Sequence, residues 1–451
     1  MNRAIFLFIL FLSTLFSHAQ KNKADFALLV QPAIFAQSKV MMHDVVNPPA
    51  ASRYYAYGTL GAYAIVARHN PAIIKPEVLI RDFKSITIST NSNSYDYRIA
   101  ALYCILETGR IMLPSGYMIE EDEAGFVKKM RSQKVAQAVL DSSIAVAKNV
   151  ATQIVAFSKE DHYNKLSALV RYTPIRGDAY WYPTPPAYIE AVEPNWKTIR
   201  PWMIDSCNQF IPSPPVAFSK DSSSAFYRQA YEVYHAVKYP KGEDVAVAAF
   251  WDCNPFAIET AGHLSIGFKK ISPGGHWMSI GCIAAQEAKL DFDHTIAVEV
   301  CLAATIADAF ISCWDEKYRS NRIRPETYIN RYIDARWQPL LQTPPFPEYT
   351  SGHSVISTAA AQVLTYLFGD NFHFTDNSEA LFELPDRSFT SFNQAAAEAA
   401  ISRMYGGIHY RDAVEYGQEE GKRIGEYVVT KLVKAGVKPV KEELTKVAHP
   451  R

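Results

Sequence analysis

The chain has 451 residues, enough for two or three average domains or one large domain. It carries 46 Lys plus Arg and 46 Asp plus Glu, so its formal charge is zero, which argues against a basic surface for nucleic acid. Hydrophobic residues make up 48% of the chain and charged residues 20%, a balance typical of globular proteins with a large core. These proportions exclude a chain that is mostly disordered.

The first twenty residues have the pattern of a secretory signal peptide. Arg3 supplies a positive charge, an apolar segment runs over 5–16, and Ser17 and Ala19 place small residues two apart, as at a signal-peptidase site. The alternative is a membrane anchor, but the apolar segment is too short to span a bilayer comfortably. We therefore expect residues 1–19 to be removed and the mature chain to be periplasmic or secreted, without a membrane span.

Helical periodicity dominates the rest of the chain. Apolar residues recur at spacings of three and four in segments that cover 98–113, 134–157, 293–314, 355–367, 391–404 and 413–434. Alternating patterns typical of strands are scarce. We therefore expect an all-α protein whose two helical-bundle halves share one core.

A Pro-rich connection over 173–215 separates these halves. It is rich in Trp and Tyr, which need burial, so we expect it to be ordered. The predicted organisation is a signal peptide (1–19), an N-terminal helical region that includes this connection (20–225) and a C-terminal helical bundle (226–440). The six cysteines show no CxxC spacing, which gives no support for a zinc or thioredoxin-like site, and their pairing stays open.

Two short motifs in the C-terminal half combine cations with hydroxyl and histidine side chains. Lys317 and Arg324 are seven residues apart, a spacing that places both on one face of a helix, and Pro325 would end that helix. Ser351 and Gly352, followed by His353, lead into the helix predicted from 355. They therefore lie near a helix N-terminus, where free N–H groups favour an anion.

A third motif contains Ser402, Arg403 and His409. Gly406 and Gly407 interrupt the predicted helix between them, so Arg403 and His409 can converge from a helix end and the following turn. Taken singly, the three motifs have simpler explanations as a solvated helix face, an N-cap turn and surface residues. Taken together, they supply three cations, a hydroxyl, a backbone N–H and two histidines, which suit a tetrahedral oxyanion.

In this order and spacing the motifs resemble those of vanadium-dependent haloperoxidases and type-2 phosphatidic acid phosphatases. That superfamily has Lys-x6-Arg-Pro, Pro-Ser-Gly-His and Ser-Arg-x5-His-x3-Asp. Here Thr350 stands where Pro is usual, and Asp412 comes one residue early, so its family role of orienting His409 is open and helix capping is the alternative. A looser resemblance, through the Trp-Tyr-Pro-Thr-Pro-Pro segment at 181–186, reaches secreted bacterial haloperoxidase-like proteins.

The resemblance implies a vanadium chloroperoxidase-like fold and an enzyme that uses bound vanadate and hydrogen peroxide to oxidise a halide, which then modifies an organic acceptor. His409 would bind vanadium directly and His353 would be the general acid or base. The residues implied to hold the vanadate oxygens are Lys317, Arg324, Ser351, Gly352 and Arg403. The alternative is an acid phosphatase-like phosphomonoesterase that binds phosphate in the same pocket, attacks a phosphate ester through His409 and forms a phosphohistidine.

Further residues near these motifs are candidates for the rest of the site. Trp314 and Phe346 resemble the aromatic residues that line the halide pocket of the chloroperoxidase branch, whereas bromoperoxidases have a His at the Phe346 position. Plain core aromatics are the alternative. Asp252 is a weak candidate to support Arg403, although the register favours the uncharged Asn254, and His276 is a weak candidate for the pocket.

Overall fold

A computed structural model describes residues 25–88, 94–261, 264–267 and 269–440 of the chain. The predicted signal peptide lies outside these residues. The described part contains fourteen α-helices and two short antiparallel hairpins, which confirms the all-α prediction. The six cysteines, all within the described residues, are free thiols.

The helices before the Pro-rich connection pack along one another. They are α2 (Val30–His43), α3 (Pro48–His69), α4 (Pro76–Leu79), α5 (Tyr97–Met112), α6 (Ile119–Ser132) and α7 (Gln137–Ser158). The sequence pattern predicted α5 and α7 to within three residues at each end. It did not reveal α3, because this helix is buried on every face from Pro48 to Ala67 and therefore lacks amphipathic contrast.

The helices of the second half carry the three motifs at their ends. They are α8 (Ala225–Lys238), α9 (Asp244–Phe250), α10 (Pro273–Glu287), α11 (Phe292–Ser320), α12 (Pro325–Tyr332), α13 (Gly352–Phe368), α14 (Phe392–Tyr405) and α15 (Arg411–Ala435). The hairpins are β1 (Ile258–Ala261) with β2 (Leu264–Gly267), and β3 (Phe374–Asp376) with β4 (Arg387–Phe389). The predicted boundary at 225/226 falls at the first residue of α8 and stays a prediction.

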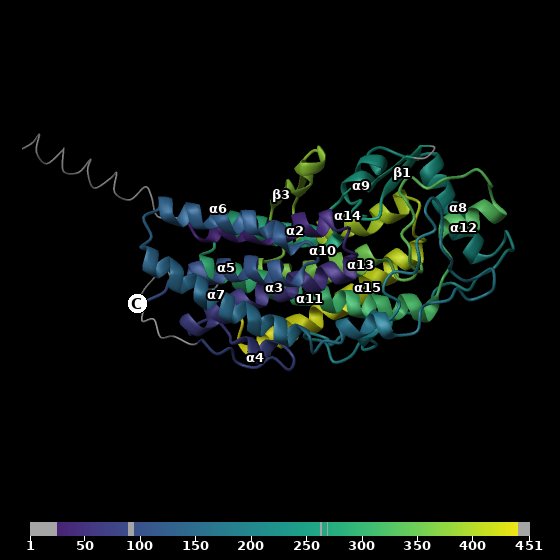
Figure 1. Ribbon diagram of the computed structural model, residues 1–451. Helices are drawn as coiled ribbons and strands as arrows, with labels where there is room; N and C mark the ends of the chain where they lie inside the picture. Colours follow the sequence, from purple (N-terminus) through teal and green to yellow (C-terminus); the bar gives the residue numbers. More distant parts are fainter. Residues whose placement is uncertain (1–24, 89–93, 262–263, 268, 441–451) are drawn as a thin grey trace, which may run out of the picture.

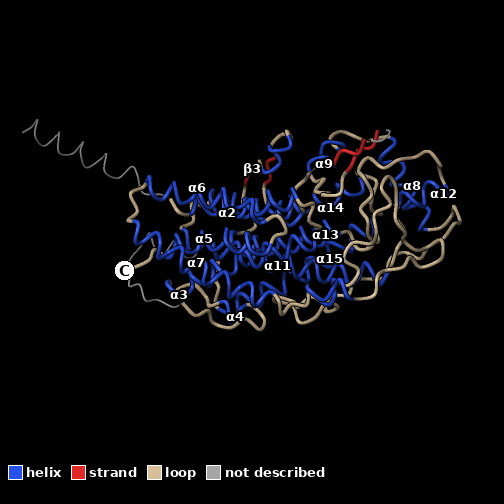
Figure 2. Tube along the Cα trace, in the orientation of Figure 1, coloured by secondary structure: helices blue, strands red, loops and turns tan. Residues whose placement is uncertain are grey.

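One hydrophobic core extends through both halves. Helix α11 lies at its centre and packs against α3 on one side and α13 on the other, and α13 packs in turn against α14 and α15. Figure 1 shows these long helices running side by side along the molecule, and Figure 2 shows the loops gathered mostly at the end that carries α8 and α12. By length and composition α11 could cross a membrane, but 94% of its most apolar window is buried, as in a core helix.

The Pro-rich connection follows a defined path over the bundle. Trp181, Trp196 and Trp202 are buried, as predicted. The backbone N–H groups of residues 202–204 donate hydrogen bonds of 2.6–2.9 Å to the carboxylate of Asp308, in the middle of α11. This carboxylate therefore fixes the connection to the central helix.

The chain between Lys317 and Arg324 differs from the prediction of one helical face. Helix α11 ends at Ser320, and Asn321 adopts a left-handed conformation with φ 48° and ψ 32°, which Asn tolerates better than most residues. Arg324 is the N-cap of α12, and Pro325 occupies its first turn, where its missing N–H costs nothing. Pro325 therefore begins a helix instead of ending one, and a bend in the chain sets the direction of Arg324.

Candidate active site

The three motifs meet around one small cavity. Its lining includes Gly352 and His353 from the start of α13, Arg403 from the last turn of α14, and His409 from the loop before α15. Ser351 caps α13 and accepts a 3.4 Å hydrogen bond from the N–H of Ser354. The helix starts at Gly352, three residues earlier than the pattern predicted, so the N–H groups of the motif residues Gly352 and His353 belong to its first turn and have no partner within the helix.

His409 is held on both ring nitrogens. Its Nδ1 lies 2.9 Å from Oε1 of Glu348, and its Nε2 lies 3.2 Å from Nη1 of Arg324. A carboxylate accepts and a guanidinium only donates, so the neutral ring carries its proton on Nδ1 and presents the Nε2 lone pair to Arg324. Burial, with the Arg324 charge next, lowers the pKa of His409 well below its ordinary value.

Glu348 is a site residue that the sequence reasoning missed. Besides His409, its Oε1 accepts a 3.0 Å hydrogen bond from the N–H of Tyr410, and burial raises its pKa to about 7. Asp412, proposed for this orienting role, instead accepts a 2.6 Å bond from Arg322 and a 3.0 Å bond from the N–H of Val216. It does not cap α15 either, because Tyr410 is the N-cap there without a side-chain bond.

The two arginines are buried with donors left over. Arg324 donates to the carbonyls of Phe346 and Ile408 at 3.0 and 2.8 Å, but its Nη2 has no partner among the described residues. Arg403 donates to the carbonyl of Trp251 at 2.7 Å, and within the described chain its Nε is likewise unpartnered. Burial, to which the Arg403 charge adds, lowers the pKa of Arg324 to about 10. Unsatisfied guanidinium donors inside a protein favour a bound anion.

Lys317 is buried beside them but uses its donors differently. Its ammonium contacts the carbonyls of Pro347, Glu348 and Thr350, so all three of its N–H donors have acceptors in the loop before α13. Burial lowers the pKa of Lys317 to about 8. In this arrangement Lys317 supports the loop and adds positive charge, and Arg324 and Arg403 provide the unused donors.

His353 faces the same group of cations. Its ring is hydrogen-bonded to the backbone of Trp251, and its Nε2 is unpartnered as far as the structure describes the chain. Burial, followed by the Arg403 charge, lowers the pKa of His353 well below its ordinary value. Trp251, which the motifs did not indicate, thus holds both Arg403 and His353 through its backbone.

Trp314 and Phe346 form an aromatic wall of the cavity. Their ring centroids lie 4.9 Å apart, and the Phe346 centroid lies 5.1 Å from both Nζ of Lys317 and Cζ of Arg324. Both rings are also buried in the hydrophobic core. These side chains therefore pack in the core and also border the cavity, and their role in a halide pocket stays a prediction.

The weak candidates occupy different surroundings. Asp252 pairs with Lys270 at 2.7 Å, and its other oxygen lies 4.0 Å from Nη2 of Arg403. The side chain of Asn254 instead donates to the carbonyl of Gln342 at 3.4 Å, so Asp252 is the residue directed at Arg403. His276 is fully buried, pairs with the carboxylates of Asp376 and Glu379, and does not line the cavity.

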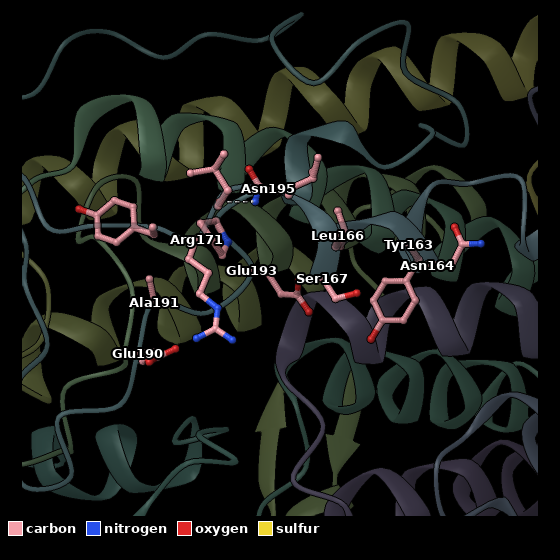
Figure 3. Close-up of a pocket in the computed structure, with 13 residues that line it drawn as sticks. Tyr163, Asn164, Leu166, Ser167, Arg171, Glu190, Ala191, Glu193 and Asn195 are labelled. Carbon is pink, nitrogen blue, oxygen red and sulfur yellow. Dashed lines mark hydrogen bonds between the residues drawn. The ribbon is translucent and has the colours of Figure 1, made fainter.

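A more open pocket of about 520 Å³ lies elsewhere, between the short helix at 163–168 and the segment 190–195. Figure 3 shows Arg171, Glu190 and Glu193 along its wall, with Tyr163 and Asn164 at the other side. None of its lining residues belongs to the three motifs. The cavity bordered by the motifs is much smaller, at about 30 Å³. Of the predicted site residues, it is lined by Gly352, His353, Arg403 and His409 with Trp314 and Phe346, whereas Lys317, Arg324 and Ser351 are not among its lining residues.

Comparison with known proteins agrees with this fold. The VCPO second helical-bundle domain family matches residues 298–436, and no curated protein sequence matches the chain. Two structures of bacterial vanadium-dependent chloroperoxidase, holo and apo, are 16% and 13% identical, with TM-scores of 0.65 and 0.63. They cover 92% and 86% of this chain and 97% and 96% of their own. The architecture is therefore that of the vanadium chloroperoxidases.

A bacterial vanadium-dependent iodoperoxidase shares more of the sequence. It is 42% identical with a TM-score of 0.84, and the match covers 90% of this chain and 96% of that chain. The chain belongs to the vanadium-dependent haloperoxidases, as its three motifs indicated.

Proposed function

We propose that this protein is a haloperoxidase that holds vanadate in the cationic cavity and uses hydrogen peroxide to oxidise a halide, with iodide preferred. The observation that carries the proposal is the pair of unpartnered donors, Nη2 of Arg324 and Nε of Arg403, next to two neutral histidines. Bound vanadate would act as a Lewis acid that activates peroxide toward halide. The preference for iodide rests on the 42% identity to an iodoperoxidase.

The residues present fit a tetrahedral oxyanion. Arg324 and Arg403 offer charged donors, and Ser351 and the N–H of Gly352 offer neutral ones at the start of α13. A Cβ placed on Gly352 would meet no atom closer than the Trp314 ring at 3.8 Å, so the backbone borders open space. His409 would bind the metal through Nε2, with Glu348 fixing its ring.

His353 is suited to move a proton. Its neutral ring has a free Nε2, and the backbone contact with Trp251 holds the other side of the imidazole. A neutral imidazole can accept the proton of incoming peroxide at neutral pH. We assign the general acid or base role to His353.

The cavity suits small reactants. Its volume of about 30 Å³ is far below the roughly 300–1,000 Å³ of pockets that enclose organic ligands, and Trp314 and Phe346 give it apolar walls beside positive charge. A weakly hydrated halide fits such surroundings. The organic acceptor would therefore react at the cavity mouth or with released hypohalous product.

The signal-peptide pattern at 1–19 supports export, and we propose that the mature enzyme is periplasmic or secreted and begins at Gln20. N-terminal sequencing of protein recovered from the periplasmic and extracellular fractions of the native host tests this cleavage.

Vanadate should stabilise the fold. Burial lowers the pKa values of Lys317, Arg324 and Arg403, and repulsion from a neighbouring arginine adds to this for Lys317 and Arg324, so a bound anion relieves this cost. At one hundred times its Kd, a ligand adds about 2.7 kcal/mol to the free energy of unfolding. We expect a rise in Tm of roughly 3 °C, with phosphate competing for the site.

Two variants make this measurement specific. Arg403→Met should remove the shift, whereas Arg171→Met, in the open pocket of Figure 3, should keep it. An unchanged Tm at saturating vanadate in the wild type would contradict oxyanion binding.

The activity itself is tested by two assays on the same preparation. We expect iodide oxidation that depends on added vanadate and peroxide, and slow hydrolysis of a phosphate ester without vanadate. Fast ester hydrolysis with no halide oxidation would favour the phosphatase alternative of the same superfamily.

Phe346→His should change the halide preference. An imidazole at this place, beside Lys317 and Arg324, can donate a hydrogen bond to the halide, which the phenyl ring cannot. The more strongly hydrated bromide gains more from such a donor than iodide does. We expect the ratio of bromide to iodide kcat/KM to rise several-fold, and an unaltered ratio would remove Phe346 from the halide pocket.

A further inference from the structure

A second cluster of ligating side chains lies beside the oxyanion cavity. Sγ of Cys253 and Oε1 of Glu379 lie 3.4 and 3.3 Å from Nδ1 of His276, and the three ligand atoms are all within 4.8 Å of one another. All three side chains are buried, with at most 2% of their residue surfaces exposed. They come from the loop after α9, the first turn of α10 and the 3-10 helix at 378–382. A short sequence motif therefore could not predict this cluster.

We propose that Cys253, His276 and Glu379 form a zinc-binding site, distinct from the oxyanion site. Cysteine sulfur, imidazole and a single carboxylate are the ligand set that zinc prefers over calcium or magnesium. Tetrahedral zinc with its usual bond lengths places neighbouring sulfur, nitrogen and oxygen ligands about 3.4–3.6 Å apart. The two separations measured from Nδ1 agree with that geometry.

Asp376 orients the His276 ring for metal binding. Its Oδ2 lies 2.7 Å from Nε2 of His276, and its Oδ1 accepts hydrogen bonds of 3.0 and 2.7 Å from the N–H and hydroxyl of Ser378. Metal-binding histidines usually donate their second ring N–H to such a held carboxylate, which fixes the ring and its tautomer. With the proton on Nε2, the lone pair of Nδ1 is directed between Cys253 and Glu379.

The charges also favour a cation here. Among the described residues, Oε1 of Glu379 has no hydrogen-bond donor despite its burial. The metal-free alternative is a protonated His276 between Asp376 and Glu379, with Sγ of Cys253 as a further contact of Nδ1. A zinc ion would engage all three ligands and compensate two negative charges.

The proposed zinc site lies next to the oxyanion cavity and shares none of the residues assigned to oxyanion binding or proton transfer. Cys253 also borders the oxyanion cavity, which offers a route by which an ion can enter. The Trp251 ring stacks on His276, with centroids 4.5 Å apart and planes 21° apart, while its carbonyl holds Arg403. Zinc would therefore anchor the segment 251–253 that positions Arg403 and His353.

Chelator-treated full-length protein without vanadate tests the proposal. We expect one zinc per chain by elemental analysis after Zn²⁺ addition and dialysis, and with Co²⁺ a thiolate-to-metal absorption band in the near ultraviolet. Cys253→Ser should lose the band, and His276→Gln should lose stoichiometric binding. Cys207→Ser, which alters a half-buried thiol in the Pro-rich connection, is the matched control and should keep both.

Asp376→Asn covers the case in which a ligand variant fails to fold. It keeps all three ligands and should weaken Zn²⁺ binding by roughly 10–100-fold, with the Co²⁺ band retained at saturation. The proposal is overturned if the wild type retains no zinc and gives no Co²⁺ band, or if Cys253→Ser binds like the wild type. These readouts are independent of halide oxidation, so they also separate this site from the proposed activity.

Discussion

His353→Ala and His409→Ala should lose activity for different reasons. His353 has an unpartnered Nε2, and no other described side chain is assigned the proton transfer, so its removal should lower the iodide oxidation rate by roughly 10²–10⁴-fold. The donors that hold the oxyanion, on Arg324 and Arg403, stay in place. Vanadate affinity in His353→Ala should therefore stay within a few-fold of the wild type.

His409→Ala should lose vanadate affinity as well as activity. Its Nε2 is the ring nitrogen that faces Arg324 and is free of the proton, so it is the atom available for a direct bond to the metal. Calorimetric titration with vanadate and the rate of iodide oxidation, measured on both variants, check the two roles. An equal loss of affinity in both variants would contradict this division, and full activity in either would remove that histidine from the site.

Glu348→Gln should weaken vanadate binding by roughly 10–100-fold, the range typical of residues that orient a metal-ligating histidine. The carboxylate accepts from Nδ1 of His409 and from the N–H of Tyr410. An amide of the same shape can present its NH₂ group to His409, which would disfavour the tautomer with a free Nε2. The affinity for vanadate, again by calorimetry, is the decisive measurement.

Asp412→Asn is the matched control for Glu348→Gln. Asp412 contacts Arg322, as Glu348 does at 3.4 Å, but its other carboxylate oxygen accepts from the N–H of Val216 and not from His409. We expect this variant to bind vanadate like the wild type. The reverse outcome, a large loss in Asp412→Asn and none in Glu348→Gln, would return the orienting role to the aspartate of the family motif.

Local sequence patterns determined the class of protein and much of its helical structure. Helices α5, α7, α11, α13 and α15 were predicted from apolar residues at helical spacing, and α14 from its Ala-rich composition. The three motifs identified the superfamily because their residue types and order are rarely combined otherwise. They also named buried cations and histidines, of which Arg403, His353 and His409 line one cavity, with Arg324 3.2 Å from Nε2 of His409.

Tertiary structure decided which partner each of these groups has. Helix α11 ends before the left-handed residue Asn321, so Arg324 does not lie on the same helical face as Lys317. The ammonium of Lys317 donates to backbone carbonyls of the loop before α13. Glu348, 61 residues from His409 in the chain, became its partner in place of the nearby Asp412.

The same holds for the cluster of Cys253, His276 and Glu379, whose members are spread over three separate segments. Helical periodicity and motif spacing report contacts within a few turns of one chain segment. The hydrogen bonds and ligand sets of a buried site depend on how distant segments pack, and on which polar groups that packing leaves without water.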